Sequence, residues 1–267
     1  MTVANPAFLP EALHLATQAA REAGALALQS FRPGAQTSAA VQFKEGGSPV
    51  TEADLAVDRL LKGRLTPFDS SIGWLSEETE DDPARLEREH VWVVDPIDGT
   101  RSFAAGKPDW GVAIALLEAG EPILGVLFIP VEGKLYTARR GGGAFLNGQS
   151  LTVSVRQEVQ GARLAGQQSV LDRVEAGAGP IIRAPKVHSL AYRLAMAADG
   201  SVDGALSSKS PHDWDLAASH ALLLEAGGVL KQADGTALRY NRLSTRHEAV
   251  LAGHPYLVDR LAAILTP

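Results

Sequence analysis

Two carboxylates three positions apart lie in the stretch WVVDPIDGT, residues 92–100. Asp95 follows an apolar run, and Asp98 directly precedes a glycine and the hydroxyl-bearing Thr100. A strand-ending turn explains this composition, because aspartate, proline and glycine are all turn residues. Two carboxylates so close together also repel one another unless a proton or a cation lies between them. Mg²⁺ pairs one or two carboxylates with phosphate oxygens, so the stretch is a candidate cation site.

Three further acids could complete a cation site, although each also has an ordinary structural explanation. Glu77 follows a short apolar run but opens an acidic stretch, and such stretches are usually solvated loops; we select Glu77 alone from it. Asp54 lies three residues after Thr51, which is the capping pattern of a helix start. Asp215 falls in the first turn of an expected helix, where the helix dipole favours a carboxylate. A purely structural reading needs a separate explanation for each of these acids, and this weakens it.

Several other chemistries lack the residues that they need. The chain has no cysteine, which excludes a disulfide framework, a thiolate metal site and a cysteine nucleophile. The aspartyl-phosphate pattern of another phosphatase class has its aspartates two apart, not three. No G-x-x-x-x-G-K-S/T loop, G-x-S-x-G elbow or H-E-x-x-H helix occurs. Covalent serine chemistry and zinc protease chemistry therefore have no support.

The charge balance bears on the partners of the chain. The 267 residues carry a net charge of -6, which argues against a broad nucleic-acid surface. No apolar run approaches the roughly 18 residues of a membrane span, and the first residues lack a secretory signal. We therefore expect a cytoplasmic protein with neither a nucleic-acid nor a membrane partner. Lys44, in a glycine-rich loop, and Lys209, shortly before Asp215, could reach an anionic ligand, and either could equally be a solvated surface charge.

Local patterns predict the elements that must position these residues. Apolar spacing and capping signals predict helices over residues 11–31, 51–65, 189–198, 215–226 and 256–265. Strands of a largely antiparallel sheet are expected at residues 91–95, 111–117, 123–129 and 134–138. Beyond residue 155 strands and helices alternate, which is an α/β pattern. We expect an N-terminal lobe, 1–155, and a C-terminal lobe, 156–267, that form one rigid catalytic unit with a cleft between them.

Five motifs together resemble a known family. They are SPVTEAD, SEET, WVVDPIDGTRSFAAGKPDWGVAIAL, GGGAFLNG and WDLAASHALLLEAGG. The chain resembles the Mg²⁺-dependent, lithium-sensitive phosphatases that include inositol monophosphatase, fructose 1,6-bisphosphatase and the 3'(2'),5'-bisphosphate nucleotidases. The resemblance covers nearly the whole chain. It implies a layered αβαβα sandwich of the α/β class, with an antiparallel sheet in the first lobe, a mixed sheet in the second and the active site in the cleft.

The resemblance also implies a set of metal ligands. Glu77, Asp95 and the carbonyl of Ile97 would hold a first Mg²⁺, and Asp95, Asp98 and Asp215 would hold a second. Glu77 would also lie near a third, weaker site. Two metals about 4 Å apart can bind both the attacking and the leaving oxygen of an in-line displacement. Two or three Mg²⁺ ions, with Li⁺ as an inhibitor, are therefore expected.

The resemblance assigns catalytic and phosphate-binding roles as well. Asp54 and Thr100 would orient and deprotonate the attacking water, with Glu77 supporting catalysis. The backbone N–H groups of Gly99 and Thr100 would hold the phosphate, as helix N-termini do. The reaction implied is hydrolysis of a small phosphorylated metabolite, by a protein that is a homodimer if it follows the family.

Two departures from the family bear on the substrate. Lys209 stands where many inositol-type members carry an acidic or apolar residue, and the helix with Arg193 begins HSLAYRLA, without the usual glycine-rich start. Both cations would suit a second phosphate, which favours a bisphosphate nucleotide or sugar bisphosphate over inositol monophosphate. The alternatives are fructose 1,6-bisphosphatase activity, a non-catalytic regulatory protein on the same fold, and an acidic cation buffer. The full ligand set and the acidic charge count against the regulatory protein, and the Asp54 and Thr100 pair counts against the buffer.

Overall fold

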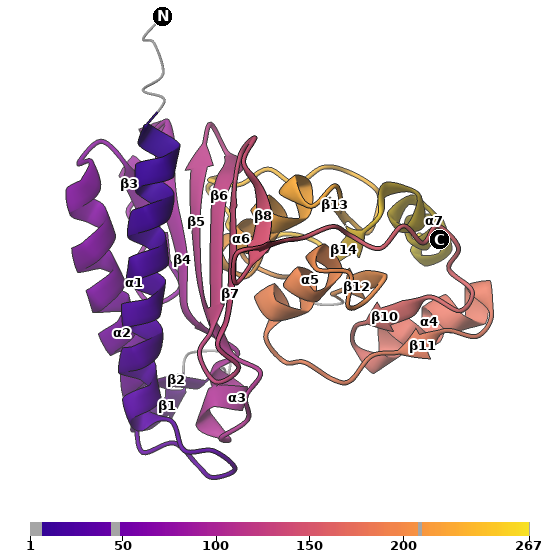
Figure 1. Cartoon of the computed structure of the whole chain (residues 1–267), viewed down its shortest axis with the longest axis horizontal. Coiled ribbons are helices and arrows are strands. Elements are labelled where there is room, and N and C mark those ends of the chain that lie inside the picture. Colours follow the sequence, from indigo (N-terminus) through magenta and orange to yellow (C-terminus); the bar gives the residue numbers. More distant parts are fainter. Residues whose placement is uncertain (1–6, 44–48, 208–209, 267) are drawn as a thin grey trace, which may run out of the picture.

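Five layers of helices and sheets make up the fold (Figure 1). The computed structural model describes residues 7–43, 49–207 and 210–266. The outer helices α1 (Phe8–Ser30) and α2 (Glu52–Leu65) cover one face of a seven-stranded sheet, whose other face carries α5 (Leu190–Ala198) and α6 (Asp213–Glu225). A five-stranded sheet follows, and α4 (Gln168–Ala178) and α7 (Pro255–Leu265) form the last layer. This is the αβαβα sandwich of the expected α/β class.

The seven-stranded sheet has its strands in sequence order. All neighbouring pairs are antiparallel except β3 and β4, which are parallel. The expected antiparallel sheet is thus confirmed, with one parallel edge. Its strands are β3 (Gly73–Ser76), β4 (His90–Asp98), β5 (Gly111–Glu118), β6 (Glu121–Ile129), β7 (Lys134–Arg139), β8 (Gly143–Leu146) and β9 (Gln149–Ser150).

The second sheet is mixed, also as expected. Its order is β11-β10-β12-β14-β13, with the first two pairs parallel and the last two antiparallel. Its strands are β10 (Arg163–Ala165), β11 (Ile182–Arg183), β12 (Gly204–Leu206), β13 (Val229–Gln232) and β14 (Val250–Gly253). The remaining elements are the antiparallel pair β1 (Val41–Phe43) and β2 (Pro49–Thr51), the short helix α3 (Thr100–Ala104) and the 3₁₀ turns η1 (Thr66–Phe68) and η2 (Pro83–Glu87).

The five predicted helices agree with α1, α2, α5, α6 and α7 to within a few residues at each end. The helix α4 was not predicted from the sequence. Its apolar side chains, Val170, Leu171 and Val174, cover barely more than one turn, and Gly177 lowers helix propensity near its end. The helix forms because those three side chains are buried in a cluster with α7. Among the described residues, every helix is either too short or too polar to cross a lipid bilayer.

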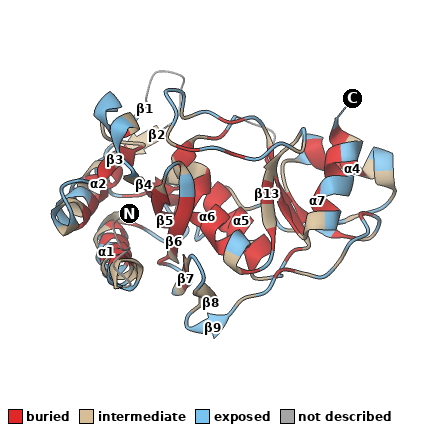
Figure 2. Ribbon diagram, turned by 90° about the horizontal axis from the view of Figure 1, so that it is seen from above, coloured by how far each residue is buried: buried red, intermediate tan, exposed pale blue. Residues whose placement is uncertain are grey.

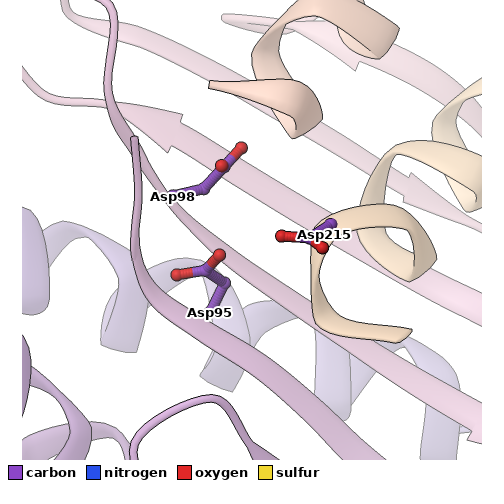
Figure 3. A group of neighbouring side chains, drawn as sticks. All are labelled: Asp95, Asp98 and Asp215. Atoms are coloured by element: carbon purple, nitrogen blue, oxygen red, sulfur yellow. The ribbon is translucent and has the colours of Figure 1, made fainter. Parts of the chain in front are cut away.

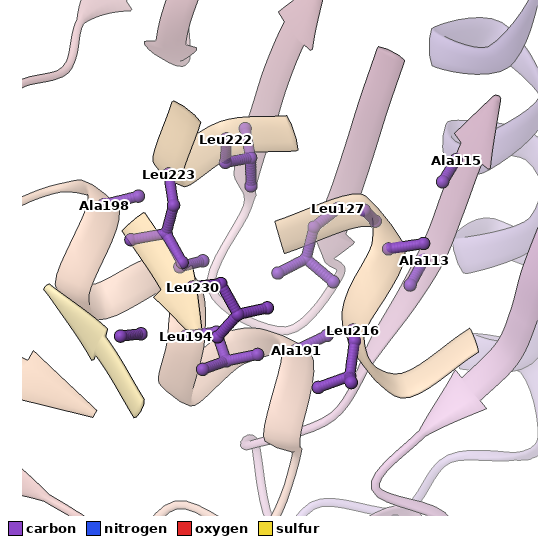
Figure 4. Close-up of a cluster of buried hydrophobic side chains, with 14 of the residues drawn as sticks. Ala113, Ala115, Leu127, Ala191, Leu194, Ala198, Leu216, Leu222, Leu223 and Leu230 are labelled. Carbon is purple, nitrogen blue, oxygen red and sulfur yellow. The ribbon is translucent and has the colours of Figure 1, made fainter. Parts of the chain in front are cut away.

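Close packing between α6 and the seven-stranded sheet sets the position of the site. Figure 2 shows buried residues on the facing sides of these elements, and Figure 4 shows Leu216 and Leu223 of α6 among the buried side chains of the same core. Gly125 of β6 has no side chain at the contact, and a Cβ there would lie 2.2 Å from the carbonyl oxygen of Ala218. The backbone of α6 can therefore approach the sheet directly. This packing holds the start of α6 near the end of β4.

Candidate active site

A bulge in β4 turns Asp95 and Asp98 toward the same side. Asp95 is opposite Ala113 of β5, whereas Asp98 is opposite Gly111, so β4 carries one extra residue between them. Residues three apart in a regular strand point to opposite faces of the sheet. The extra residue in β4 brings the side chains of Asp95 and Asp98 to the same face. The strand was predicted to end at residue 95, which was wrong, because β4 continues to Asp98. Pro96 lies in the bulge, where its missing N–H costs no ladder hydrogen bond.

Asp215 approaches from the first turn of α6. The backbone N–H of His212 donates to its carboxylate at 2.6 Å, which closes the capping box of that helix. Asp95, Asp98 and Asp215 each offer one oxygen, and these oxygens lie within 4.8 Å of one another (Figure 3). Asp95 and Asp98 are buried and Asp215 is partly buried. Three carboxylates from β4 and α6 therefore converge on a space the size of a metal site.

Glu77 and Ile97 line a cavity together with these three aspartates. Glu77 follows β3, and its backbone N–H donates to the carbonyl of Val94 at 3.3 Å, which ties it to β4. Glu77 lies outside the group of three converging oxygens. The carbonyl oxygen of Ile97 lies 3.1 Å from the hydroxyl of Thr100. Both residues thus reach the site from neighbouring strands.

The acidic cluster is electrostatically unfavourable without a cation. Burial, with repulsion from Glu77, Asp98 and Asp215, raises the pKa of Asp95 well above its usual range. Burial raises the pKa of Asp98 to about 6, against hydrogen bonds from Ser189 and Ala191 that lower it. Burial and the Asp98 charge also raise the pKa of Asp215. A cation bound among these oxygens would reverse the shifts, because it favours the charged form of each carboxyl. The oxygen-only donor set fits a hard ion such as Mg²⁺.

Asp98 is held by the start of α5. The Ser189 hydroxyl and the Ala191 N–H both donate to the same carboxylate oxygen of Asp98, each at 2.6 Å. The Leu190 N–H donates to the other oxygen at 3.3 Å. Ser189 is also the N-cap of α5, since its hydroxyl accepts from the Tyr192 N–H at 3.0 Å. The sequence analysis did not find this role. Serine at a helix start was the available signal, but that signal predicts only the cap.

Asp54 connects the cap of α2 to the cavity. One oxygen of its carboxylate accepts from the Thr51 N–H at 2.8 Å, as the capping pattern predicts. Its other oxygen accepts from the Thr100 hydroxyl at 3.1 Å. Burial raises the pKa of Asp54, although hydrogen bonds from Thr51 and Thr100 oppose this. The cap therefore positions a buried carboxylate against a hydroxyl that lines the cavity.

A cavity of about 680 Å³ is lined by Glu77, Asp95, Asp98 and Asp215. Gly99, Thr100 and Arg193 line it together with the acids. Arg193 is 7% exposed, its Nε has no hydrogen-bond partner, and one Nη lies 3.5 Å from the Val187 carbonyl oxygen. The expected substrate contacts Lys44 and Lys209 lie outside the described residues. His188, a residue that was not selected from the sequence, also lines the cavity.

Comparisons with known proteins agree with this class of fold. The model of the inositol monophosphatase family matches residues 9–266. An inositol-1-monophosphatase of Rhizobium meliloti is 32% identical over 84% of this chain and 86% of its own length. A 3'(2'),5'-bisphosphate nucleotidase, CysQ, of Aggregatibacter actinomycetemcomitans is 33% identical over 78% of this chain and 80% of its own. The crystal structure of the extragenic suppressor protein suhB from Bartonella henselae superposes with a TM-score of 0.81 at 28% identity, covering 95% of this chain and 97% of that one.

A five-layered sandwich with an acidic, oxygen-only site between its sheets defines a class of metal-dependent phosphatases. The family match covers nearly the whole chain, and the fold is that of the solved structure. The chain belongs to the inositol monophosphatase family. Two relatives of almost equal identity carry names with different substrates, so identity alone does not select the phosphate ester.

Proposed function

We propose that the chain is a Mg²⁺-dependent phosphomonoesterase that hydrolyses a small phosphate ester with metal-activated water. The convergence of Asp95, Asp98 and Asp215 within 4.8 Å carries the proposal. In our assignment Glu77, Asp95 and the Ile97 carbonyl hold one Mg²⁺, and Asp95, Asp98 and Asp215 hold another. Glu77 would also serve a third, weaker site. Bound Mg²⁺ supplies Lewis-acid stabilisation of the phosphoryl oxygens and lowers the pKa of bound water.

The chain's own residues supply a route for the proton. In our proposal the attacking water donates its proton to the Thr100 hydroxyl oxygen while that hydroxyl donates to Asp54. The 3.1 Å contact between Thr100 and Asp54 supports this relay. A carboxyl whose pKa is raised by burial is a better proton acceptor than an exposed one. Asp54 therefore acts as the base through Thr100, while Glu77 assists as a ligand.

The turn after β4 supports phosphate binding. Gly99 is the N-cap of α3 and Thr100 is its first residue, so their N–H groups have no acceptor within the helix. Gly99 has a φ of 98°, and a Cβ there would lie 3.0 Å from the Asp109 carbonyl oxygen. Only glycine adopts this conformation without strain. We propose that these two N–H groups bind the phosphate that is hydrolysed.

Replacing Thr100 by valine tests the relay. Valine keeps the shape of threonine but removes the hydroxyl, so kcat should fall about 100-fold, the scale of losing positioned acid–base catalysis. KM should change little. Thr100→Ser keeps the hydroxyl and is the matched control, with kcat expected within a few-fold of the unchanged chain. Steady-state phosphate release measures both. A valine variant as active as the serine variant would contradict the relay.

The nature of the substrate rests on the cations of the cavity. Arg193 is buried without an ion pair among the described residues, and a buried guanidinium is unfavourable unless an anion meets it. This supports a substrate with a second phosphate, such as 3'-phosphoadenosine 5'-phosphate or fructose 1,6-bisphosphate, over inositol monophosphate. We place Lys44 and Lys209 in the same role on their positions in the sequence alone. The family resemblance leads us to propose a homodimer that Li⁺ inhibits, and we keep the cytoplasm as its proposed location.

Phosphate release with Mg²⁺ tests the proposed function. Inositol 1-phosphate, 3'-phosphoadenosine 5'-phosphate and fructose 1,6-bisphosphate would be compared in parallel, with and without Li⁺. We expect Li⁺-inhibited hydrolysis with the highest kcat/KM for one of the bisphosphates. A higher kcat/KM for inositol 1-phosphate would reverse the substrate assignment. No hydrolysis of any of them, with Mg²⁺ binding demonstrated by calorimetry, would favour the regulatory alternative. Light scattering on the same sample gives the oligomeric state.

A further inference from the structure

The imidazole of His188, which lines the cavity, is hydrogen-bonded to a carboxylate from a distant part of the chain. Asp109, two residues before β5, accepts two hydrogen bonds on one oxygen, from the backbone N–H of His188 at 2.7 Å and from its Nδ1 at 2.9 Å. Burial would raise the pKa of Asp109, yet these hydrogen bonds hold that pKa below its usual range. Asp109 therefore fixes both the main chain and the ring of His188.

The other ring nitrogen of His188 is left for a ligand. Because Nδ1 donates to a carboxylate, the tautomer is set and Nε2 is the remaining polar atom. Within the described ranges, Nε2 makes no hydrogen bond, and His188 lines the cavity with its side chain 28% exposed. None of the steps proposed above uses this ring. A fixed imidazole facing a cavity is a typical substrate contact.

The neighbourhood of His188 places it beside the reaction centre. The next residue, Ser189, donates to Asp98 at 2.6 Å. The Asp109 carbonyl oxygen lies 3.0 Å from the point where a Cβ on Gly99 would stand. The pair thus adjoins both the proposed metal site and the proposed phosphate site, and Arg193 and Lys186 line the same cavity.

We infer that His188, fixed by Asp109, contacts the substrate and, with Arg193, binds a second anionic group of that substrate through Nε2. The inference rests on the proposed function and names the residue that selects among its substrates. With Nδ1 donating to Asp109, a proton on Nε2 lets the ring donate a second hydrogen bond, to that anionic group. Asp109 is a positioning residue in this account. His188 and Arg193 both line the cavity and would hold the second anionic group, whereas the hydrolysed phosphate would lie against the acids.

Two substitutions separate a substrate contact from a structural role. His188→Asn places an amide near the position of Nδ1, so it can keep the bond to Asp109 while leaving nothing at Nε2. His188→Gln places its amide nitrogen near the position of Nε2 and gives up the bond from Nδ1. Both keep the backbone N–H bond to Asp109. His14→Asn, on an exposed position of α1 in the outer layer, is the matched control.

The readout is the ratio of kcat/KM for 3'-phosphoadenosine 5'-phosphate to that for 4-nitrophenyl phosphate, which has a single phosphate. We expect His188→Asn to lower this ratio about tenfold through KM, the scale of one charge-assisted hydrogen bond. His188→Gln should lower it less, and His14→Asn should leave it unchanged. A ratio unchanged in His188→Asn would overturn the inference, as would a larger loss in His188→Gln than in His188→Asn, since that order marks a structural role.

The same experiment separates this inference from the proposed function. Hydrolysis by the unchanged chain, with no change of the ratio in either His188 variant, removes the inference and leaves the phosphatase intact. An unchanged chain that hydrolyses neither substrate nor inositol 1-phosphate overturns the proposed function and the inference with it.

Discussion

Asp98→Asn will lower kcat about 1,000-fold or more while the chain stays folded. Asp98 lies within 4.8 Å of the oxygens of Asp95 and Asp215, and asparagine removes the negative charge that a second cation needs. Losing one preorganised electrostatic group in an active site costs on the order of 100- to 1,000-fold. A metal ligand lies at the upper end of that range. The measurement is kcat at saturating Mg²⁺, for the best substrate of the panel.

The fold should tolerate this change. The asparagine oxygen can still accept from Ser189 and from the Ala191 N–H, which hold Asp98 at 2.6 Å. Burial raises the pKa of Asp98 to about 6, so removing its charge relieves an unfavourable state of the metal-free chain. Asp69→Asn, at an exposed loop position, is the control for a carboxylate lost elsewhere. An Asp98→Asn variant that keeps its turnover would contradict the two-metal assignment.

Asp95→Asn will stabilise the metal-free chain at pH 8 by about 2 kcal/mol, the scale of one unsatisfied buried polar group. Burial and the charges of Glu77, Asp98 and Asp215 raise the pKa of Asp95 well above its usual range. Between the ordinary pKa and the raised one, the folded chain holds a proton that the unfolded chain has released. The free energy of unfolding of the unchanged chain therefore falls as pH rises through this interval. The Asp95→Asn variant does not lose this stability, because asparagine does not titrate.

Urea unfolding in EDTA at pH 5 and pH 8 measures this effect. The gain of Asp95→Asn over the unchanged chain should be larger at pH 8. His220, whose pKa burial lowers to about 4, gives the opposite slope, but it contributes equally to both proteins and cancels in their difference. With Mg²⁺ at about 100 times its Kd the order should invert, since the ion stabilises the unchanged chain by about 2.7 kcal/mol. A gain that is equal at both pH values would contradict the prediction.

The sequence by itself determined those features that depend on residues a few positions apart. Asp54 lies three residues after Thr51, and this spacing alone predicted the capping box that the structure contains. Asp215 was predicted in the first turn of a helix, and α6 places it there. Helix starts are set by hydrogen bonds between residues two to four apart, so the sequence carries their signal directly. The helix α4 was missed because its short apolar pattern becomes meaningful only against α7.

Only the tertiary structure decided how the site is assembled. The bulge between Asp95 and Asp98 depends on the register of β4 against β5, which no local pattern fixes. Ser189 reaches Asp98 across 91 residues of chain, and His188 reaches Asp109 across 79. A contact at such a separation exists because packing brings two elements together. The local sequence around one partner does not predict the other. The acids could be chosen from the sequence, whereas their burial, their common direction and the fixed imidazole beside them follow from the fold.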